Sequence, residues 1–275
     1  MVTRMLNEES EFETILIPRV EGVPAYFVTA LMPKRYPTAL VIPVLNENER
    51  VINQLRQINQ ANLDVDVIIA DGGSDDGSTE AGLLTLLGVN TILIKTDIGK
   101  LSAQLRMAIS YCLDHGYESI ITMDGNGKDG VDGVERIRAA LSTGCDFVQG
   151  SRFCAGGIAS NTPLSRYLAI RLVHAPLTSL GALHWYTDTT NGFRGHSRRF
   201  LTDPRVQPLR SYFQTYELLA YLPIRAARLG FQVTEVPVSR AYPGDKSSAT
   251  KIHGCRAHFS LLRVLIAAVI GRMSP

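Results

Sequence analysis

The sequence lacks the features that mark several large functional classes. Its 28 Lys and Arg residues nearly balance 26 Asp and Glu residues, giving a net charge of +2, so the clustered basic face of a nucleic-acid-binding protein is not indicated. Its four cysteines form no CxxC pair, which indicates reduced thiols in a cytoplasmic protein. No HExxH pairs the histidines and no GxGxxG follows the first expected core strand, so a zinc enzyme and a Rossmann dehydrogenase are both disfavoured.

Long apolar segments are also missing. The start, MVTRMLNEESEFE, has no apolar stretch of signal-peptide length, so secretion is not expected. The longest apolar run, 261–270, is interrupted by Arg263 and falls well short of the ~20 residues that cross a bilayer. Two interpretations stay open: a C-terminal helix packed on the domain, or a helix in the plane of a membrane, flanked by Arg256 and Arg272. The expected location is the cytoplasm, with the inner face of the membrane as the alternative.

The remaining pattern is that of an α/β protein. The chain has 275 residues, of which 45% are hydrophobic and 20% charged, as in ordinary globular proteins. Short apolar runs alternate with segments of helical spacing, which predicts a Rossmann-like, mostly parallel sheet flanked by helices. Strands are expected at 38–44, 66–70, 91–95, 119–123 and 146–150, and helices at 48–60, 79–87, 100–115, 131–142 and 163–180.

A β-hairpin is predicted before this alternation, where FETILIPRV and VPAYFVTAL flank the turn residues Glu21 and Gly22. The expected organisation is therefore an N-terminal hairpin extension over 1–37 and a main domain over 38–240. A loop and an amphipathic C-terminal helix follow over 241–275.

Polar loops follow the expected strands, at the edge where parallel sheets bind ligands. The first loop, IPVLNENE at 42–49, contains Asn46, which can cap the next helix, and Glu47, which lies at the edge of the expected site.

The second loop, ADGGSDDGS at 70–78, contains more polar residues than a turn requires. Asp71 can accept hydrogen bonds from a base or a ribose, while Gly73 and its neighbour Gly72 let the backbone approach a ligand closely. Asp75 or Ser78 can cap the following helix.

The third loop, MDGNGKDG at 123–130, carries acidic residues at a strand end. Such residues serve a divalent cation that prefers oxygen ligands. A cation here would bridge diphosphate oxygens and neutralise charge on a leaving nucleotide. A glycine-rich turn with an Asx cap is the structural alternative.

Six segments in order resemble the family 2 glycosyltransferases with a GT-A fold, and within them the dolichyl-phosphate mannosyltransferase type. These segments are IPVLNENE, ADGGSDDGS, DIGKLSAQLRMAI, MDGNGKDG, QGSRF and NGFRG. The resemblance covers about residues 38–240. It implies a nucleotide-diphosphate-sugar donor, a divalent cation such as Mg²⁺ or Mn²⁺, and inversion at the anomeric carbon.

The resemblance also implies roles for individual residues. Asp124 and Asn126 stand at the positions of the family's metal-binding acidic pair. Arg152 and Arg194 stand where relatives place positive charge near phosphates. The residues assigned to donor binding are Pro43, Asn46, Glu47, Asp71, Gly73, Gly99, Lys100, Asp124, Gly125, Arg152 and Arg194.

One departure from the family concerns the cation. The family pattern is Asp-x-Asp followed by Gln two residues later, whereas this chain has Asp124, Asn126 and Lys128. Formal charges make the pocket about two charges more positive than the family pattern. Either Asp129 or Asp132 completes the cation site, or the Lys128 ammonium takes over part of the catalytic role by pairing with the diphosphate. A weakly bound or dispensable cation is the preferred prediction.

The acceptor side is less specific. If the acceptor is a sugar hydroxyl, a carboxylate must remove its proton, and Asp188 is the first candidate and Glu217 the second. If the acceptor is a lipid phosphate, no base is required. The expected helix 163–180 forms either a core helix or a wall of the acceptor site. The loop 239–254 is expected to be a lid in which a lysine supplies charge, either Lys246 or Lys251.

The leading hypothesis is a hexosyl-type glycosyltransferase for cell-surface polysaccharide or glycolipid synthesis. Its acceptor is a polyprenyl phosphate or a glycan, and a peripheral membrane contact and a homodimer stay open. A nucleotidyltransferase is disfavoured, because IPVLNENE is acidic where that class has a Gly-rich loop with Arg and Lys. The alternative is a catalytically weak, nucleotide-sugar-binding regulatory or partner protein, which Asn126 and Lys128 keep open.

Overall fold

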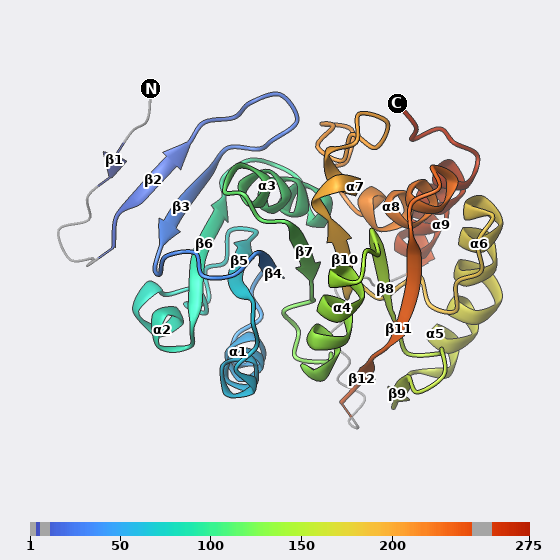
Figure 1. Cartoon of the computed structure of the whole chain (residues 1–275), viewed down its shortest axis with the longest axis horizontal. Helices are drawn as coiled ribbons and strands as arrows, with labels where there is room; N and C mark the ends of the chain where they lie inside the picture. The colour runs from blue at the N-terminus through green and yellow to red at the C-terminus, as the bar shows by residue number, and fades with distance from the viewer. Residues whose placement is uncertain (1–3, 6–11, 244–254) are drawn as a thin grey trace. The chain divides into compact units, whose positions relative to one another are not determined.

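The structure is a computed structural model that describes residues 4–5, 12–243 and 255–275. The chain forms two compact units, whose elements are labelled in Figure 1. The first unit comprises Met1–Gly127 and Pro208–Thr215, and the second comprises Lys128–Gln207 and Tyr216–Pro275. The boundaries expected at 37 and 240 stay predictions.

Parallel strands form the centre of the first unit. β4 (Thr38–Val44) pairs with β5 (Asp66–Asp71) on one side and β7 (Ser119–Thr122) on the other, and β6 (Val89–Lys95) continues from β5. All these pairings are parallel, and β5 is buried along its whole length, as expected for a sheet covered on both faces. The carboxyl ends of these strands therefore meet at one edge of the sheet.

The predicted helices of the first unit are also present. They are α1 (Glu49–Ala61), α2 (Ala81–Leu86) and α3 (Leu101–Asp114). α1 buries Val51, Ile52, Leu55 and Ile58, the stripe of helical spacing that predicted it. α3 packs on β4, β5 and β6.

The predicted hairpin is confirmed and belongs to the same sheet. β2 (Thr14–Ile17) pairs antiparallel with β3 (Tyr26–Ala30), and β1 (Arg4–Met5) pairs antiparallel with β2. β3 then pairs antiparallel with β6, so the hairpin extends the sheet of the first unit.

The second unit is built around β8 (Phe147–Ser151). β10 (Arg194–Ser197) pairs with it antiparallel and β11 (Val233–Pro237) parallel, and α4 (Asp132–Ser142) packs on all three strands. A second, small sheet joins β9 (Ile158–Ser160) to β12 (Ser239–Ala241) in parallel. The unit also contains α7 (Arg198–Thr202) and α8 (Glu217–Arg228), and its largest fully buried apolar side chains are Tyr186, Phe147, Phe193 and Phe200.

The helix predicted over 163–180 is interrupted and mostly exposed in its first half. It consists of α5 (Leu164–Ala169), a π-helical turn η1 (Ile170–His174) and α6 (Ala175–Ala182). Pro176, near the start of α6, has no N–H to donate to the carbonyl four residues earlier, which explains why the α-helical ladder changes just before it. α5 buries none of its residues, so the expectation of a core helix is wrong for this part.

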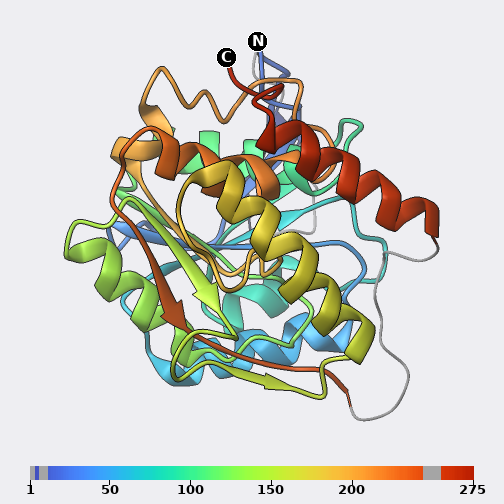
Figure 2. The ribbon, with the colours of Figure 1, turned by 90° about the vertical axis from the view of Figure 1, so that its right-hand side faces the viewer.

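The C-terminal helix α9 (Cys255–Val269) packs against α6 and α8. Figure 2 shows α9 next to α6 on the same face of the second unit. Packing on the domain, one of the two interpretations of 261–270, is thus confirmed, although Phe259, Ile266 and Ile270 stay exposed. Among the residues that the structure describes, no helix combines the length and apolar character needed to cross a bilayer.

Candidate functional site

In the first unit, hydrogen bonds tie the loop after β4 to the loop after β5. The Asn46 amide N–H donates to Ser74 Oγ at 3.0 Å, and the Asp75 N–H donates to Asn46 Oδ1 at 3.0 Å. The Asn48 N–H donates to Asp76 Oδ2 at 2.8 Å. These bonds hold both loops in one arrangement at the edge of the sheet.

The predicted helix caps are wrong in this region. The N-cap of α1 is Asn48 rather than Asn46, and its side chain makes no capping bond. The N-cap of α2 is Glu80, whose carboxylate accepts from two backbone N–H groups of the first turn, rather than Asp75 or Ser78. Asn46 instead connects the two loops.

Asp71 organises the second loop from a buried position. Its carboxylate accepts from the Gly73 N–H at 3.2 Å, the Ser74 N–H at 3.0 Å and Ser74 Oγ at 2.6 Å. Only 1% of Asp71 is exposed. The contact of Asp71 with a base or ribose stays a prediction, and the structure gives the carboxylate a role in shaping the loop as well.

Lys95, at the carboxyl end of β6, lies at the same edge of the sheet and was not among the residues predicted from the sequence. It is buried, and its Nζ donates to the Asp97 carbonyl. Burial lowers the pKa of Lys95, and the charges of Asp97 and Asp71 only partly offset this. A charged residue closing the apolar run TILIK at the ligand edge was the signal that could have identified it.

The remaining residues predicted to bind the donor in the first unit lie at the same edge. Glu47 is largely buried and pairs with Arg50 at 3.1 Å. Gly99 has a φ of +117° and a Cβ there would lie 2.6 Å from Ala103 Cβ, so the turn before α3 requires glycine. The exposed Lys100 is the N-cap of α3.

The loop that begins at Asp124 is held against β4 and α1. Gln54 Nε2 donates to the Asp124 carbonyl at 3.1 Å, and the Gly127 N–H donates to Gln54 Oε1 at 3.0 Å. A Cβ on Gly125 would lie 3.0 Å from the Pro43 carbonyl oxygen, so the close approach depends on glycine. The first unit therefore gathers the predicted residues Pro43, Asn46, Glu47, Asp71, Gly73, Gly99, Lys100, Asp124, Gly125 and Asn126 at the ends of its parallel strands.

The residues at the predicted cation site do not fit a site built on paired carboxylates. Asn126 Nδ2 lies 3.4 Å from Asp124 Oδ2, so this position offers one carboxylate and one amide. In the second unit the Asp129 carboxylate is paired with Arg240, and Asp132 is paired with Arg136 at 2.8 Å. Across the described parts of the chain, no three His, Cys, Asp or Glu side chains are grouped as for a metal ion.

In the second unit, Asp188 forms a buried ion pair with Arg152. Asp188 Oδ2 accepts from Arg152 Nε at 2.6 Å and Oδ1 accepts from Nη2 at 2.8 Å. The two side chains are 0% and 2% exposed. This geometry favours a role for Asp188 in holding Arg152 over the predicted role of removing a proton from an acceptor.

Arg194 has a local structural role, whereas the role of Glu217 as a base stays a prediction. The buried Arg194 guanidinium donates to three backbone carbonyls, those of Asn191, Thr189 and Leu219. These bonds favour a structural role over the predicted contact with a donor phosphate. Glu217 is the first residue of α8, where the helix dipole favours a carboxylate.

Four cationic side chains surround Tyr242, which the sequence reasoning did not select. Arg166 Nη1 donates to the Tyr242 hydroxyl at 2.9 Å, and Arg152 Nη1 lies 3.4 Å from the same oxygen. Lys128 Nζ lies 5.1 Å from the centre of the Tyr242 ring and Arg240 Cζ lies 5.9 Å from it. These five residues, Lys128, Arg152, Arg166, Arg240 and Tyr242, are called the Tyr242 cluster below.

Positively charged side chains affect the ionisation of Tyr242. Burial alone would raise the pKa of Tyr242, but the charges of Arg240, Arg166 and Arg152, with the hydrogen bond from Arg166, lower it below its usual value. Lysines 246 and 251, the expected lid residues, lie outside the described residues.

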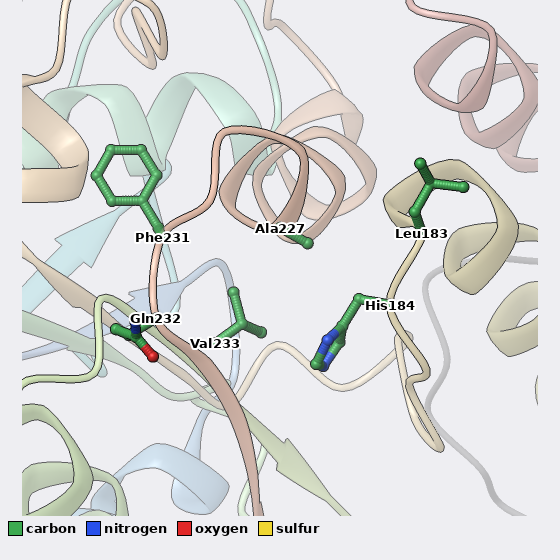
Figure 3. A pocket seen from close by; sticks show the side chains of 6 residues that line it. All are labelled: Leu183, His184, Ala227, Phe231, Gln232 and Val233. Atoms are coloured by element: carbon green, nitrogen blue, oxygen red, sulfur yellow. The ribbon is translucent and has the colours of Figure 1, made fainter.

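The second unit also has a shallow pocket with a volume of 240 Å³. Figure 3 shows Leu183 and His184 on one side of it and Phe231 and Gln232 on the other. None of the predicted donor, acceptor or metal residues lines it, so we assign it no ligand.

No protein-family model matches the chain. Two relatives are similar over most of its length. A polyprenol monophosphomannose synthase of Mycolicibacterium smegmatis is 25% identical over 239 residues, which are 86% of this chain and 88% of that protein. An undecaprenyl-phosphate mannosyltransferase of Micrococcus luteus is 27% identical over 204 residues, which are 72% of this chain and 81% of that protein.

Solved structures show a similar fold. Glucosyl-3-phosphoglycerate synthase from Mycobacterium tuberculosis, in complex with Mn²⁺, uridine diphosphate and phosphoglyceric acid, matches with a TM-score of 0.61 and 18% identity, covering 86% of this chain and 78% of that one. The same enzyme with Mg²⁺ and uridine diphosphate matches with a TM-score of 0.58, at 17% identity over 86% and 78% of the two chains. The predicted GT-A fold, and the resemblance on which it rested, are confirmed.

Proposed function

We propose that this glycosyltransferase, which resembles the dolichyl-phosphate mannosyltransferase branch of family 2, moves a sugar with inversion from a nucleotide-diphosphate-sugar to a polyprenyl phosphate. The observation that carries the choice of acceptor is the Tyr242 cluster. Two relatives named for polyprenyl-phosphate acceptors support it.

The donor is assigned to the first unit. Three loops lie at the carboxyl ends of parallel strands, where α/β proteins bind nucleotides. They are the hydrogen-bonded loops after β4 and β5 and the loop that begins at Asp124. Buried Asp71 and Lys95 supply one acceptor and one donor group for reading the nucleoside.

The acceptor phosphate is assigned to the Tyr242 cluster. A phosphate accepts charge-assisted hydrogen bonds from guanidinium and ammonium groups. Arg166, which α5 contributes to the cluster, is half-buried. A phosphate oxygen is already anionic and attacks the anomeric carbon without a base. This agrees with Asp188 being held in an ion pair.

The experiment compares ligands that differ only in the phosphate. We expect a short polyprenyl phosphate to raise the melting temperature and the corresponding polyprenol to have little effect. Arg166→Gln and Tyr242→Phe should weaken binding of the phosphate about 10-fold or more, the effect of losing a hydrogen bond to a charged group. Arg138→Gln, on the exposed face of α4 with its own partner Glu135, is the matched control. Equal binding of alcohol and phosphate would contradict the assignment.

The catalytically weak, nucleotide-sugar-binding protein is the competing proposal. It predicts donor binding with no release of nucleoside diphosphate in the presence of any acceptor. Transfer to a polyprenyl phosphate would exclude it.

We further propose that a divalent cation binds weakly and is dispensable for donor binding, because Asn126 replaces a carboxylate and Asp129 and Asp132 are paired with arginines. The variant Asn126→Asp is expected to bind Mn²⁺ at least about 10-fold more tightly than wild type, since it restores a second negative oxygen ligand. Titration of Mn²⁺ by calorimetry measures this directly, without turnover. Tight Mn²⁺ binding by wild type, or full loss of donor binding in EDTA, would contradict the proposal.

A peripheral membrane contact is proposed for the exposed apolar face of α5, η1 and α6. Leu172 and Trp185 are each 69% exposed, and residues 147–187 contain no Asp or Glu, which suits an anionic lipid surface. The other large apolar side chains exposed there are Leu164, Tyr167, Leu168, Val173, Leu180 and Leu183. The proposed membrane contact therefore involves this segment, and the exposed residues of α9 are a second candidate.

The double variant Leu172→Ser/Trp185→Ser is expected to lose at least about 10-fold in affinity for vesicles with anionic lipids, because each apolar side chain that leaves water contributes roughly 1.5–3 kcal/mol. Cosedimentation with vesicles measures the change. Leu86→Ser, at an 80% exposed leucine of α2 in the first unit, is the matched control and should bind as wild type does. If control and double variant behave alike, this surface is not the one that binds lipid.

A further inference from the structure

Glu235, on β11, is a half-buried carboxylate that binds the backbone of the Asp188 loop. Its oxygens accept from the Thr187 N–H at 2.9 and 3.0 Å, from Thr187 Oγ1 at 2.7 Å and from the Asp188 N–H at 3.2 Å. Three donors from two consecutive residues therefore converge on one carboxylate.

The partners of Glu235 are neutral groups. Within the described residues no Lys, Arg or His forms an ion pair with it. Burial raises the pKa of Glu235, the nearby Asp188 charge adds to this, and the hydrogen bonds from the loop lower it. Removing a carboxylate from water is unfavourable. The hydrogen bonds that Glu235 accepts fix the backbone of residues 187 and 188.

A second set of hydrogen bonds, made by Ser151, fixes the backbone next to Arg152, the ion-pair partner of Asp188. Ser151 Oγ lies 2.6 Å from Thr187 Oγ1, and it accepts from the N–H groups of Phe153 and Cys154 at 3.1 Å each. Ser151 ends β8 and directly precedes Arg152. The Glu235–Thr187–Ser151 contacts therefore set both ends of the Arg152–Asp188 ion pair.

We infer that Glu235 is a positioning residue of the phosphate site: it fixes the loop that presents Asp188 to Arg152, and so places the Arg152 guanidinium beside Tyr242. This inference rests on the proposed function of the Tyr242 cluster. Glu235 itself touches neither Arg152 nor Tyr242 by any hydrogen bond among the described residues.

The variant Glu235→Gln tests the inference. Glutamine keeps the size of the side chain, but its NH₂ group would face one of the three donors, so the loop must shift. The dissociation constant for farnesyl phosphate is expected to rise about tenfold, as for the loss of one charge-assisted hydrogen bond. Val236→Ala, next along β11, is a control that destabilises the same strand without removing a side-chain hydrogen-bonding group.

A double-mutant cycle separates positioning from simple stabilisation. Arg152→Lys keeps the charge next to Asp188 but cannot form the two-point contact or reach the Tyr242 hydroxyl in the same way. If Glu235 acts through Arg152, Glu235→Gln has little further effect on farnesyl phosphate binding in the Arg152→Lys background. Thr187→Val, which removes one donor to Glu235, should give a smaller effect in the same direction and replaces Glu235→Gln if that variant does not fold.

Each outcome is decisive. Wild-type affinity in Glu235→Gln and Thr187→Val, additive effects in the cycle, or an equal loss in Val236→Ala overturns the positioning role while leaving the phosphate site intact. Failure of wild type to bind farnesyl phosphate overturns the phosphate site and this inference with it. A loss in Glu235→Gln that disappears in the Arg152→Lys background supports the inference.

Discussion

Replacing Arg152 by methionine is expected to lower the free energy of unfolding by about 3–5 kcal/mol, because it leaves the Asp188 carboxylate buried without its cation. The pair is almost fully removed from water and is bonded at two points, 2.6 and 2.8 Å. Burial alone would lower the pKa of Arg152, but the hydrogen bond and charge of Asp188 raise it. Denaturant unfolding monitored by circular dichroism measures the loss.

The double variant Arg152→Met/Asp188→Leu provides the control. It removes both charges, so it should recover most of the stability lost in the single variant. A single variant that costs less than about 1 kcal/mol would show that the ion pair is not formed as described.

The same pair distinguishes the two roles of Asp188. A general base replaced by asparagine loses turnover while the protein keeps its stability. A residue that holds Arg152 loses stability and phosphate binding together, which is the result expected here for Asp188→Asn.

Acid is expected to destabilise the second unit through His196. This residue is buried between aromatic rings, with ring centres 5.4 Å from Phe147 and 6.3 Å from Phe200. Burial, and next the charge of Arg194, lower the pKa of His196 to about 3. In the unfolded chain an ordinary histidine has a pKa of about 6.5.

The direction in which stability changes with pH follows from these two pKa values. Well above pH 6.5 the histidine is neutral in both states and contributes no pH dependence. Between pH 6.5 and about 3 only the unfolded chain binds the proton, so stability falls by about 1.4 kcal/mol per pH unit, or about 2 kcal/mol by pH 5.

The variant His196→Phe isolates this contribution, because phenylalanine suits the aromatic surroundings and does not titrate. The difference in unfolding free energy between variant and wild type should be constant above pH 7 and should change by about 2 kcal/mol in favour of the variant by pH 5. A difference that does not vary with pH would show that His196 is not buried as a neutral ring.

The sequence predicted the strands and helices of the first unit well because each has a strong local pattern. The run TALVIPV is bounded and fully apolar, and it forms β4 over the expected residues. The gathering of polar loops at one edge of the sheet was predictable for the same reason, since these loops directly follow such runs. The sequence could not show which loop residues form hydrogen bonds with each other, as Asn46 and Asp75 do.

The second unit was less predictable because its site residues are far apart in the chain. Lys128, Arg152 and Arg166 meet Tyr242 only through folding. Each one alone resembles an ordinary surface or core residue. The ion pair of Asp188 was hidden in the same way, so a carboxylate shortly before the segment NGFRG was interpreted as a base.

One residue, Pro176, indicated the break in the helix predicted over 163–180, but the apolar periodicity of the segment favoured a continuous helix. Pro176 lies inside the apolar pattern, where a continuous α-helix would require its missing N–H. The segment from Leu164 to Trp185 exposes several large apolar side chains, and it is the surface for which we propose a membrane contact.

The most direct test of the central claim is a transfer assay with separated products. The protein is incubated with a panel of nucleotide-diphosphate-sugars and a polyprenyl phosphate in detergent, and the lipid fraction is analysed by mass spectrometry. The account predicts a polyprenyl-phosphate sugar, formed with release of nucleoside diphosphate and strongly reduced in Arg166→Gln. Sugar transfer to a glycan but not to the lipid phosphate, or donor binding with no transfer to either, would contradict it.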